Sequence, residues 1–184
     1  VCVDPSRSPF MRERIEVLES AVSIEALAEK MSTHSAGAKT FRVQCVNDIA
    51  FGETSKLPHA ERRHAEREIA LVIDGEPELK APDIQYGLLY YAGEWYIGYY
   101  EKSESVWLKH VQKPQSYSTA LSTRVARAIA NIAAPVIEDV RIIDPCCGIG
   151  TVIVEALSMG MNIVGRDISP YVCIGSRKNI AHFG

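Results

Sequence analysis

Alternation of apolar and polar residues predicts strands in the first part of the chain. Thr40–Val46 alternates in this way, which is typical of a half-buried strand. Ile84–Tyr91 and Glu94–Tyr100 form the clearest hairpin, with a turn at Ala92–Gly93. The tyrosines and Trp95 of this hairpin form an aromatic stripe, for which a core position is favoured over stacking on unpaired RNA bases.

Helical spacing of apolar residues predicts helices in three stretches before the C-terminal part of the chain. Residues 11–31 carry apolar side chains at roughly helical intervals and predict one helix, which a break near Ser23 would divide. Pro58–Asp74 predicts a second helix, which is charged at its start and apolar at its end, and Gly75–Pro77 ends it. Ser122–Ala133 predicts an amphipathic helix with a serine cap.

The most informative stretch is a strand, a tight turn and a helix in the C-terminal part of the chain. The β-branched run Val140–Ile143 leads to Asp144–Pro145, and a helix is expected from Thr151. Gly148 and Gly150 let the turn fold back sharply and keep side chains away from a ligand. The free N–H groups at the helix start suit the carboxylate or phosphate end of a small ligand.

A second strand that ends in an acid follows this unit. Asn162–Gly165 predicts the strand, and Asp167 lies just beyond it. An acid at this place in a βαβ unit can accept hydrogen bonds from ribose hydroxyls. The loop lacks the third glycine of the dinucleotide fingerprint, which argues against the alternative of a nucleotide-dependent oxidoreductase.

These residues carry a resemblance to a known family. Asp144–Thr151 resembles the first motif of class I S-adenosylmethionine-dependent methyltransferases, and Gly165–Ile168 resembles their second motif. The continuation to Gly184 resembles RNA methylases that carry a THUMP domain before the catalytic domain, here in truncated form. The resemblance implies that the first motif surrounds the methionine part of S-adenosylmethionine and that Asp167 holds its ribose. The cofactor-binding residues implied are Asp144, Pro145, Cys146, Gly148, Gly150, Thr151, Asp167 and Ile168.

The same resemblance implies an α/β fold with two domains. The strand–helix–strand–strand order from Thr40 to Glu101 resembles a THUMP-like α/β RNA-binding domain, and the start of a Rossmann-like class I methyltransferase domain follows it. Small residues at 32–38 and an extended stretch at 113–118 predict linkers. The expected boundaries are 1–35 for a partial N-terminal ferredoxin-like segment, 36–110 for the THUMP-like domain, 111–121 for a linker and 122–184 for the incomplete methyltransferase domain.

The reaction implied by the resemblance is methyl transfer from S-adenosylmethionine to an RNA base. The expected acceptor is the N2 amino group of guanine in tRNA or rRNA. Members of the family hold that amino group with an Asp- or Asn-Pro-Pro-aromatic motif, which this sequence does not contain. No catalytic residue is therefore predicted, and the fragment itself is expected to be inactive. The alternative from another class is an RNA-binding adaptor without catalysis.

Charge gives no overall case for nucleic-acid binding. The chain of 184 residues has a net charge of −3 and a pI of about 6.0, so any basic surface must be local. The glutamates interleaved with the arginines of the helix predicted at 58–74 favour a solvated face over phosphate contacts. Arg124 and Arg127 either border the cofactor or face solvent. The candidate RNA contacts are Arg42, Arg62, Arg63, Arg67, Lys109 and Lys113.

The cysteines and the hydropathy bear on the cellular compartment, on metal binding and on membrane association. Five cysteines with irregular spacing favour a reducing, cytoplasmic location over a disulfide framework. Cys146 and Cys147 are adjacent, which is poor spacing for zinc ligands, so no metal site is predicted. No apolar run approaches the roughly 20 residues that cross a bilayer, so no membrane partner is expected. Two exposed strands of an unfinished sheet predict either a homodimer or aggregation through unpaired strand edges.

Overall fold

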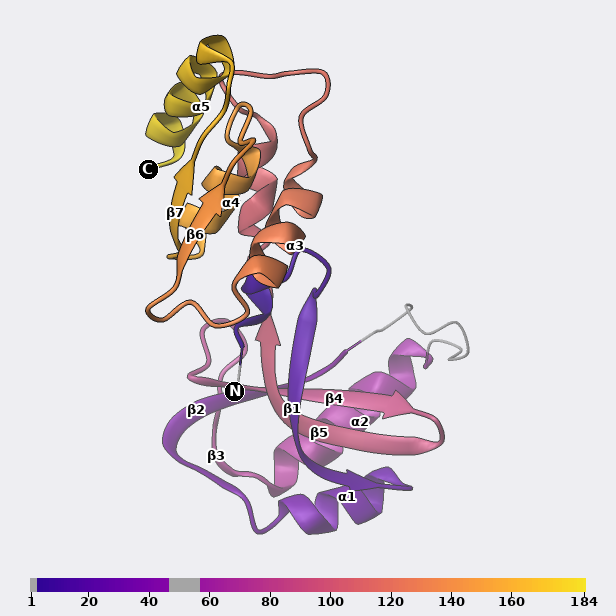
Figure 1. Cartoon of the computed structure of the whole chain (residues 1–184). Coiled ribbons are helices and arrows are strands. Elements are labelled where there is room, and N and C mark those ends of the chain that lie inside the picture. The colour runs from indigo at the N-terminus through magenta and orange to yellow at the C-terminus, as the bar shows by residue number, and fades with distance from the viewer. Residues whose placement is uncertain (1–2, 47–56) are drawn as a thin grey trace. The chain divides into compact units, whose positions relative to one another are not determined.

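The computed structural model describes residues 3–46 and 57–184, and the chain divides into two compact units (Figure 1). The five-stranded unit contains Glu13–Glu101. The glycine-loop unit contains Val1–Arg12 together with Lys102–Gly184. Both are built from helices and strands, in agreement with the predicted α/β class. The THUMP-like and ferredoxin-like assignments and their boundaries stay predictions.

The five-stranded unit is a mixed sheet with two helices. Its strand order is β1-β5-β4-β2-β3; β2 runs parallel to β3 and β4, and β4 and β5 are antiparallel. The predicted hairpin is confirmed, with Tyr91 opposite Glu94 beside the turn. The elements are β1 (Glu13–Ala21), α1 (Ile24–Met31), β2 (Ser35–Cys45), α2 (His59–Val72), β3 (Asp74–Pro77), β4 (Ile84–Tyr91) and β5 (Glu94–Lys102).

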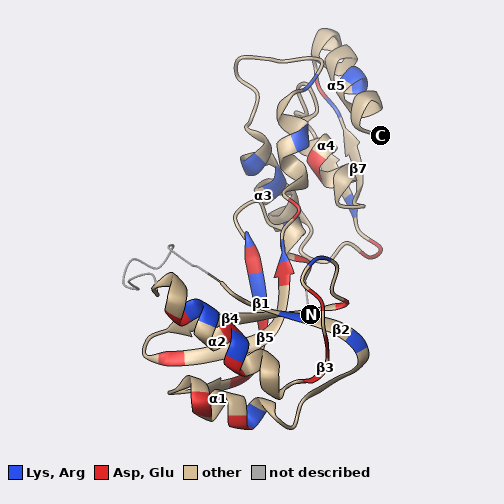
Figure 2. Cartoon of the chain, turned by 180° about the vertical axis from the view of Figure 1, so that it is seen from behind, with Lys and Arg blue, Asp and Glu red and all other residues tan. Residues whose placement is uncertain are grey.

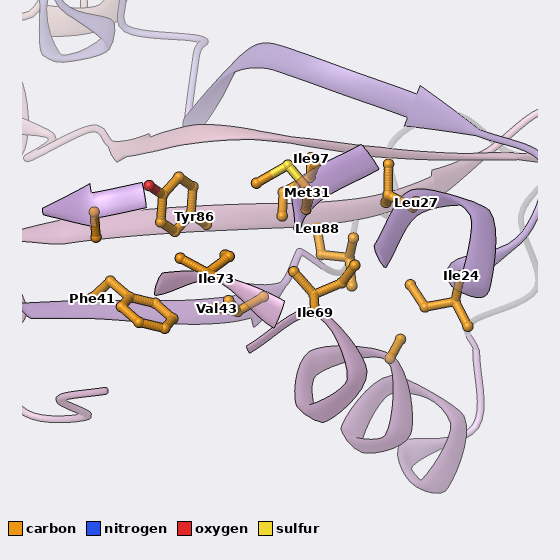
Figure 3. Packing of buried hydrophobic residues seen from close by; sticks show 12 residues of the cluster. Ile24, Leu27, Met31, Phe41, Val43, Ile69, Ile73, Tyr86, Leu88 and Ile97 are labelled. Carbon is orange, nitrogen blue, oxygen red and sulfur yellow. The ribbon is translucent and has the colours of Figure 1, made fainter. Parts of the chain in front are cut away.

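The core of this unit lies between the sheet and its helices (Figure 3). Tyr86 on β4 is buried, contacts Phe41 edge-on at 6.1 Å between ring centroids and stacks on Tyr99. The core interpretation of the aromatic stripe is therefore right for Tyr86, whereas Tyr91 and Tyr99 are exposed. The buried members of the core are Ile24, Leu27, Met31, Ala36, Phe41, Val43, Ala65, Ile69, Ile73, Tyr86, Leu88 and Ile97.

The helix expected over residues 11–31 is wrong in its first half. Residues 13–21 form β1, which lies beside β5, and α1 begins only after Ser23. The Ser23 hydroxyl caps α1 by accepting the Ala26 N–H at 3.2 Å. Ile15 and Leu18 are spaced as on a helix, but β-branched Ile15 and Val17 also alternate as on a strand, and pairing with β5 decides between the two.

The predicted linker at 32–38 and the stop at Gly75–Pro77 both contain strand residues. β2 already begins at Ser35, and its register with β3 shifts between Ser35 and Thr40, near Gly37 with a φ of +65°. Residues 74–77 form the edge strand β3. Local sequence cannot predict such pairing, because small and turn-forming residues enter a strand only when a partner strand is present.

The glycine-loop unit carries the second α/β arrangement. Its two strands, β6 and β7, are parallel, as the sequence predicts. Ser122 caps α3 through the Val125 N–H, which confirms the predicted cap. Its elements are the short 3-10 helices η1 (Pro5–Arg7) and η2 (Val106–Val111), followed by α3 (Thr123–Ala133), β6 (Arg141–Asp144), α4 (Thr151–Ser158), β7 (Asn162–Gly165) and α5 (Pro170–Phe183).

Candidate ligand-binding site

The carboxyl ends of β6 and β7 meet at one edge, and the glycine loop begins there. Asp144 on β6 is opposite Gly165 on β7. Beyond the strands, the Arg166 N–H donates to the Asp144 carbonyl at 2.8 Å, and the Cys147 N–H donates to the Arg166 carbonyl at 2.8 Å. These two bonds fix the start of the glycine loop, residues 145–150, against the chain after β7. α4 then begins at Thr151, as predicted.

The two glycines of the loop have different surroundings. Gly148 has a φ of +52°, and a Cβ added there would meet open space. Gly150 has a φ of +78°, and a Cβ there would collide with the Ser176 hydroxyl of α5. Both need the left-handed backbone that glycine adopts without strain. Gly148 therefore leaves room on the open side of the loop, and Gly150 allows close packing with α5.

A cavity of about 660 Å³ lies beside this loop. Ligand pockets in proteins commonly have this size, and they are mostly apolar with a few polar groups. Here the polar groups include Asp144 and Asp167 from the strand ends, and residues 117–121 with the side chains of α3 supply a largely apolar wall. The arrangement suits a ligand that combines hydroxyl or amino groups with an apolar ring.

Asp167 holds the glycine loop with its own carboxylate. Its two oxygens accept the N–H groups of Gly148 and Ser169, each at 2.9 Å. The backbone N–H groups of Ser169 and Gly148 lower the pKa of this carboxyl below its ordinary value, so it is charged at neutral pH. A carboxylate has about four acceptor positions, so each oxygen can also accept a ligand hydroxyl.

Most of the predicted cofactor residues border the cavity. Cavity-lining members are Asp144, Pro145, Cys146, Gly148, Thr151 and Asp167. Gly150 lies behind the loop against α5, and Ile168 is 99% exposed and does not line the cavity. Asp144 accepts the Cys146 N–H at 3.2 Å, which turns the chain at the end of β6.

The structure adds residues that pattern alone did not predict. Asn179 on α5 is fully buried and donates to the Ile149 carbonyl of the glycine loop at 3.0 Å. Ser176, also buried on α5, packs against Gly150. Both lie on a helix that starts after the second acid, and their spacing of three residues on one helix face is the only sequence signal that could have found them.

The two arginines of α3 lie outside the cavity lining. Arg127 is 3% exposed and pairs with the buried Glu155 at 3.0 Å, so neither of the two expected positions applies to it. Arg124 is exposed and its guanidinium lies 4.4 Å from the centroid of the Trp107 ring. Arg127 is thus part of the packing of the unit, and Arg124 covers an aromatic ring.

This part of the chain is similar to a known protein family. Residues 111–180 match a methyltransferase domain. The matching family model is described as UPF0020, RMKL-like, methyltransferase domain, and the matched residues contain the glycine loop, both strand ends and the first eleven residues of α5. We call residues 111–180 the methyltransferase segment. The match confirms the methyltransferase resemblance that the motifs predict.

Two curated relatives resemble the chain over 73 residues. The tRNA (guanine(10)-N2)-dimethyltransferase of Methanothermobacter thermautotrophicus is 37% identical, and the match covers 40% of this chain and 21% of that enzyme. The enzyme of the same name from Pyrococcus abyssi is 34% identical over the same shares of the two chains. The chain therefore corresponds to a small part of these relatives.

One solved structure resembles a larger share of the chain. TrmN from Thermus thermophilus has a TM-score of 0.44 and 16% sequence identity, covering 95% of this chain and 54% of that protein. A TM-score of this size does not establish a common fold.

The candidate RNA contacts lie in both units. Arg42 on β2 donates to the Leu79 carbonyl at 3.2 Å. Arg62, Arg63 and Arg67 lie on α2, where basic and acidic side chains alternate (Figure 2). Arg63 pairs with Glu66 at 3.2 Å, as expected for a solvated face. In the methyltransferase segment, Lys113 is half-buried, and burial lowers the pKa of its ammonium group. Lys109, just before this segment, is exposed.

Residues 3–46 and 57–184 were compared with the requirements of a metal-ion cluster and of a membrane-spanning helix, and neither is met. No group of three or more His, Cys, Asp or Glu side chains in these ranges is placed to hold a metal ion. No helix in the same ranges is both long and apolar enough to cross a membrane. Cys45, Cys146, Cys147 and Cys173 are free thiols.

Proposed function

We propose that this chain is part of an RNA methyltransferase that takes its methyl group from S-adenosylmethionine, and that the cavity beside the glycine loop forms part of the cofactor site. The observation that carries the proposal is the arrangement of Asp144, Gly148 and Asp167 around one cavity, within a segment that matches a methyltransferase domain. When bound, S-adenosylmethionine would supply a methyl group that is activated by the positive charge on its sulfur.

The residues present fit this cofactor in size and in chemistry. Gly148 leaves its side of the loop free of a side chain, so a ligand can approach the backbone. Asp167 is charged and keeps free acceptor positions for the ribose hydroxyls. Asp144, at the end of β6, is placed to attract the amino group of the methionine part. Ile129 and Ile163 supply apolar surface for the adenine ring.

For the acceptor, we propose the N2 amino group of a guanine in RNA, which the names of the two curated relatives favour. The proposed RNA contacts are Arg62, Arg63 and Arg67 of α2 together with Arg42 and Lys109, and the five-stranded unit would act as the THUMP-like RNA-binding domain. Lys113 is a weaker candidate because it is partly buried. The cytoplasmic location and the homodimer also stay proposals.

Replacement of the second acid tests the cofactor site. Asp167→Ala removes both the ribose acceptor and the carboxylate that holds Gly148, so affinity for S-adenosylhomocysteine should fall by about tenfold or more. The measurement is isothermal titration at a temperature where circular dichroism shows both proteins folded. Glu138→Ala, an exposed acid outside the cavity lining in the same unit, is the control and should bind as wild type. Unchanged affinity in Asp167→Ala would contradict the assignment.

A further inference from the structure

Asn179 makes three hydrogen bonds with two separate stretches of backbone. Its side chain is fully buried on α5. Its oxygen Oδ1 accepts the Gln115 N–H at 2.9 Å, and its Nδ2 donates to the Gln115 carbonyl and to the Ile149 carbonyl, each at 3.0 Å. Both donor hydrogens of the amide are therefore used, and the three hydrogen bonds together fix the orientation of the side chain.

The two stretches that Asn179 joins both contribute residues to the cavity lining. Ile149 belongs to the glycine loop. Gln115 belongs to residues 112–121, which form neither helix nor strand. From this segment, Tyr117, Thr119, Ala120 and Leu121 line the cavity, although Tyr117 is more than half exposed. The two hydrogen bonds between Gln115 and Asn179 connect this segment to α5.

Close packing of α5 supports the same connection. Gly175, one turn before Asn179, is buried, and a Cβ added there would lie 3.5 Å from the Ile149 side chain and 3.7 Å from that of Gln115. The helix thus approaches both stretches at one place. Asn179 itself does not line the cavity.

We propose that Asn179 is a positioning residue for cofactor binding, because it holds residues 115–121 against the glycine loop and so keeps one wall of the cavity in place before the ligand arrives. The inference rests on the proposed function, since the ligand is S-adenosylmethionine. A wall that is already ordered does not have to lose conformational freedom on binding, and affinity is higher for that reason.

The test compares Asn179→Ala with a matched control, Asn131→Ala, in the full chain. Asn131 on α3 also makes three hydrogen bonds: it accepts from Arg7 Nε at 2.7 Å and donates to the Arg7 and Arg127 carbonyls, each at 3.0 Å. It does not line the cavity. Both variants lose a side-chain amide and its bonds in the same unit, but only Asn179→Ala releases residues 115–121.

We expect Asn179→Ala to weaken S-adenosylhomocysteine binding by about tenfold or more and Asn131→Ala to change it by less than about twofold, both measured by titration calorimetry on folded protein. Hydrogen–deuterium exchange gives a second readout. Residues 112–121 should exchange faster in free Asn179→Ala than in the wild type, and bound ligand should slow that exchange more in the variant. If Asn179→Ala does not fold, Asn179→Asp serves in its place, because it keeps the acceptor for the Gln115 N–H and loses both donors.

The outcomes separate this inference from the proposed function. Wild-type protein that binds no S-adenosylhomocysteine would contradict the proposed function, and the role of Asn179 with it. Wild-type binding together with wild-type affinity in Asn179→Ala would overturn the role of Asn179 alone. Equal losses in Asn179→Ala and Asn131→Ala would also overturn it, because the effect would then follow from reduced stability.

Discussion

At the scale of single residues, Cys45, Cys146 and Cys147 differ in their surroundings, although the last two are adjacent in the sequence. Cys146 is exposed and lines the cavity. Cys147 is half-buried, and burial raises the pKa of its thiol, with the Asp144 carboxylate adding to the rise. Burial, helped by Glu66, raises the pKa of Cys45 to about 12. Since the thiolate is the reactive form, these thiols should differ in reactivity.

We predict that iodoacetamide at pH 8 modifies Cys146 well before Cys147 or Cys45, and that S-adenosylhomocysteine slows the modification of Cys146. The first effect follows from exposure and from the raised pKa values of the other two thiols. The second follows from the place of Cys146 in the cavity lining. Peptide mass spectrometry over a time course measures both. Faster modification of Cys45 than of Cys146, or a modification rate of Cys146 that is unchanged by saturating S-adenosylhomocysteine, would contradict this description.

The strand–turn–helix pattern of the sequence predicts where Asp144, Gly148, Gly150 and Asp167 lie relative to β6, α4 and β7, while their binding of a cofactor stays a prediction. It does not predict that each carboxylate oxygen of Asp167 accepts a hydrogen bond from a backbone N–H group. Nor does it predict that Gly150 packs closely against Ser176. Asn179 was not predicted at all. Its role depends on Gln115, which is 64 residues away in the sequence and comes close only in the folded chain.

At the scale of elements, a buried group of charges joins four parts of the glycine-loop unit. Glu155 on α4 is fully buried and pairs with Arg127 of α3 at 3.0 Å and with His110 of η2 at 2.8 Å. Arg127 also donates to the carbonyls of Ser6 and Arg7 at 2.8 and 3.0 Å, which holds η1. The glycine loop leads directly into α4, so this group of charges stabilises the base of the candidate site.

The effects of removing Arg127 and Glu155 on stability should not be additive. Arg127→Met removes the guanidinium that faces the buried Glu155 and leaves His110 as its remaining side-chain partner from another element, and we expect a loss of about 3–5 kcal/mol in the free energy of unfolding. The double variant Arg127→Met with Glu155→Leu should lose less than the sum of the two single changes. Urea unfolding of the full chain gives the values. Additive losses would show that the pairing does not stabilise the unit in this way.

Element prediction succeeded where one periodicity was clear and failed where two overlapped. α3 and the β4–β5 hairpin follow unambiguous patterns and strong turn or cap residues. Residues 13–21 satisfy both a helical and a strand pattern, and contact with β5, far away in the sequence, selects the strand. β3 is a short edge strand of turn-forming residues that only its pairing with β2 reveals.

At the scale of the whole molecule, an RNA substrate must find local basic surface on a chain of net charge −3. Arg67 on α2 is exposed, in a helix where arginines and glutamates alternate (Figure 2). If α2 contacts RNA, each phosphate-bound arginine contributes to affinity and to its salt dependence. If the helix is only a solvated face, neither quantity depends on it.

We predict that Arg67→Glu lowers RNA affinity and reduces the slope of log affinity against log salt by about one. Fluorescence anisotropy with a labelled tRNA at several salt concentrations measures both quantities. Lys80→Glu, an exposed position of the same unit that lies outside α2, is the matched control for the change in net charge and should keep the wild-type slope. An unchanged slope in Arg67→Glu would leave α2 as a solvated face.

The most direct test of the central claim, that the cavity beside the glycine loop binds S-adenosylmethionine, is a titration of S-adenosylhomocysteine and of NAD into the wild-type chain. The loop carries two glycines and is preceded by Asp144, as in the methyltransferase motif that it resembles. We predict saturable binding of S-adenosylhomocysteine and affinity for NAD that is weaker by about tenfold or more. Absence of S-adenosylhomocysteine binding, or tighter binding of NAD, would contradict the claim.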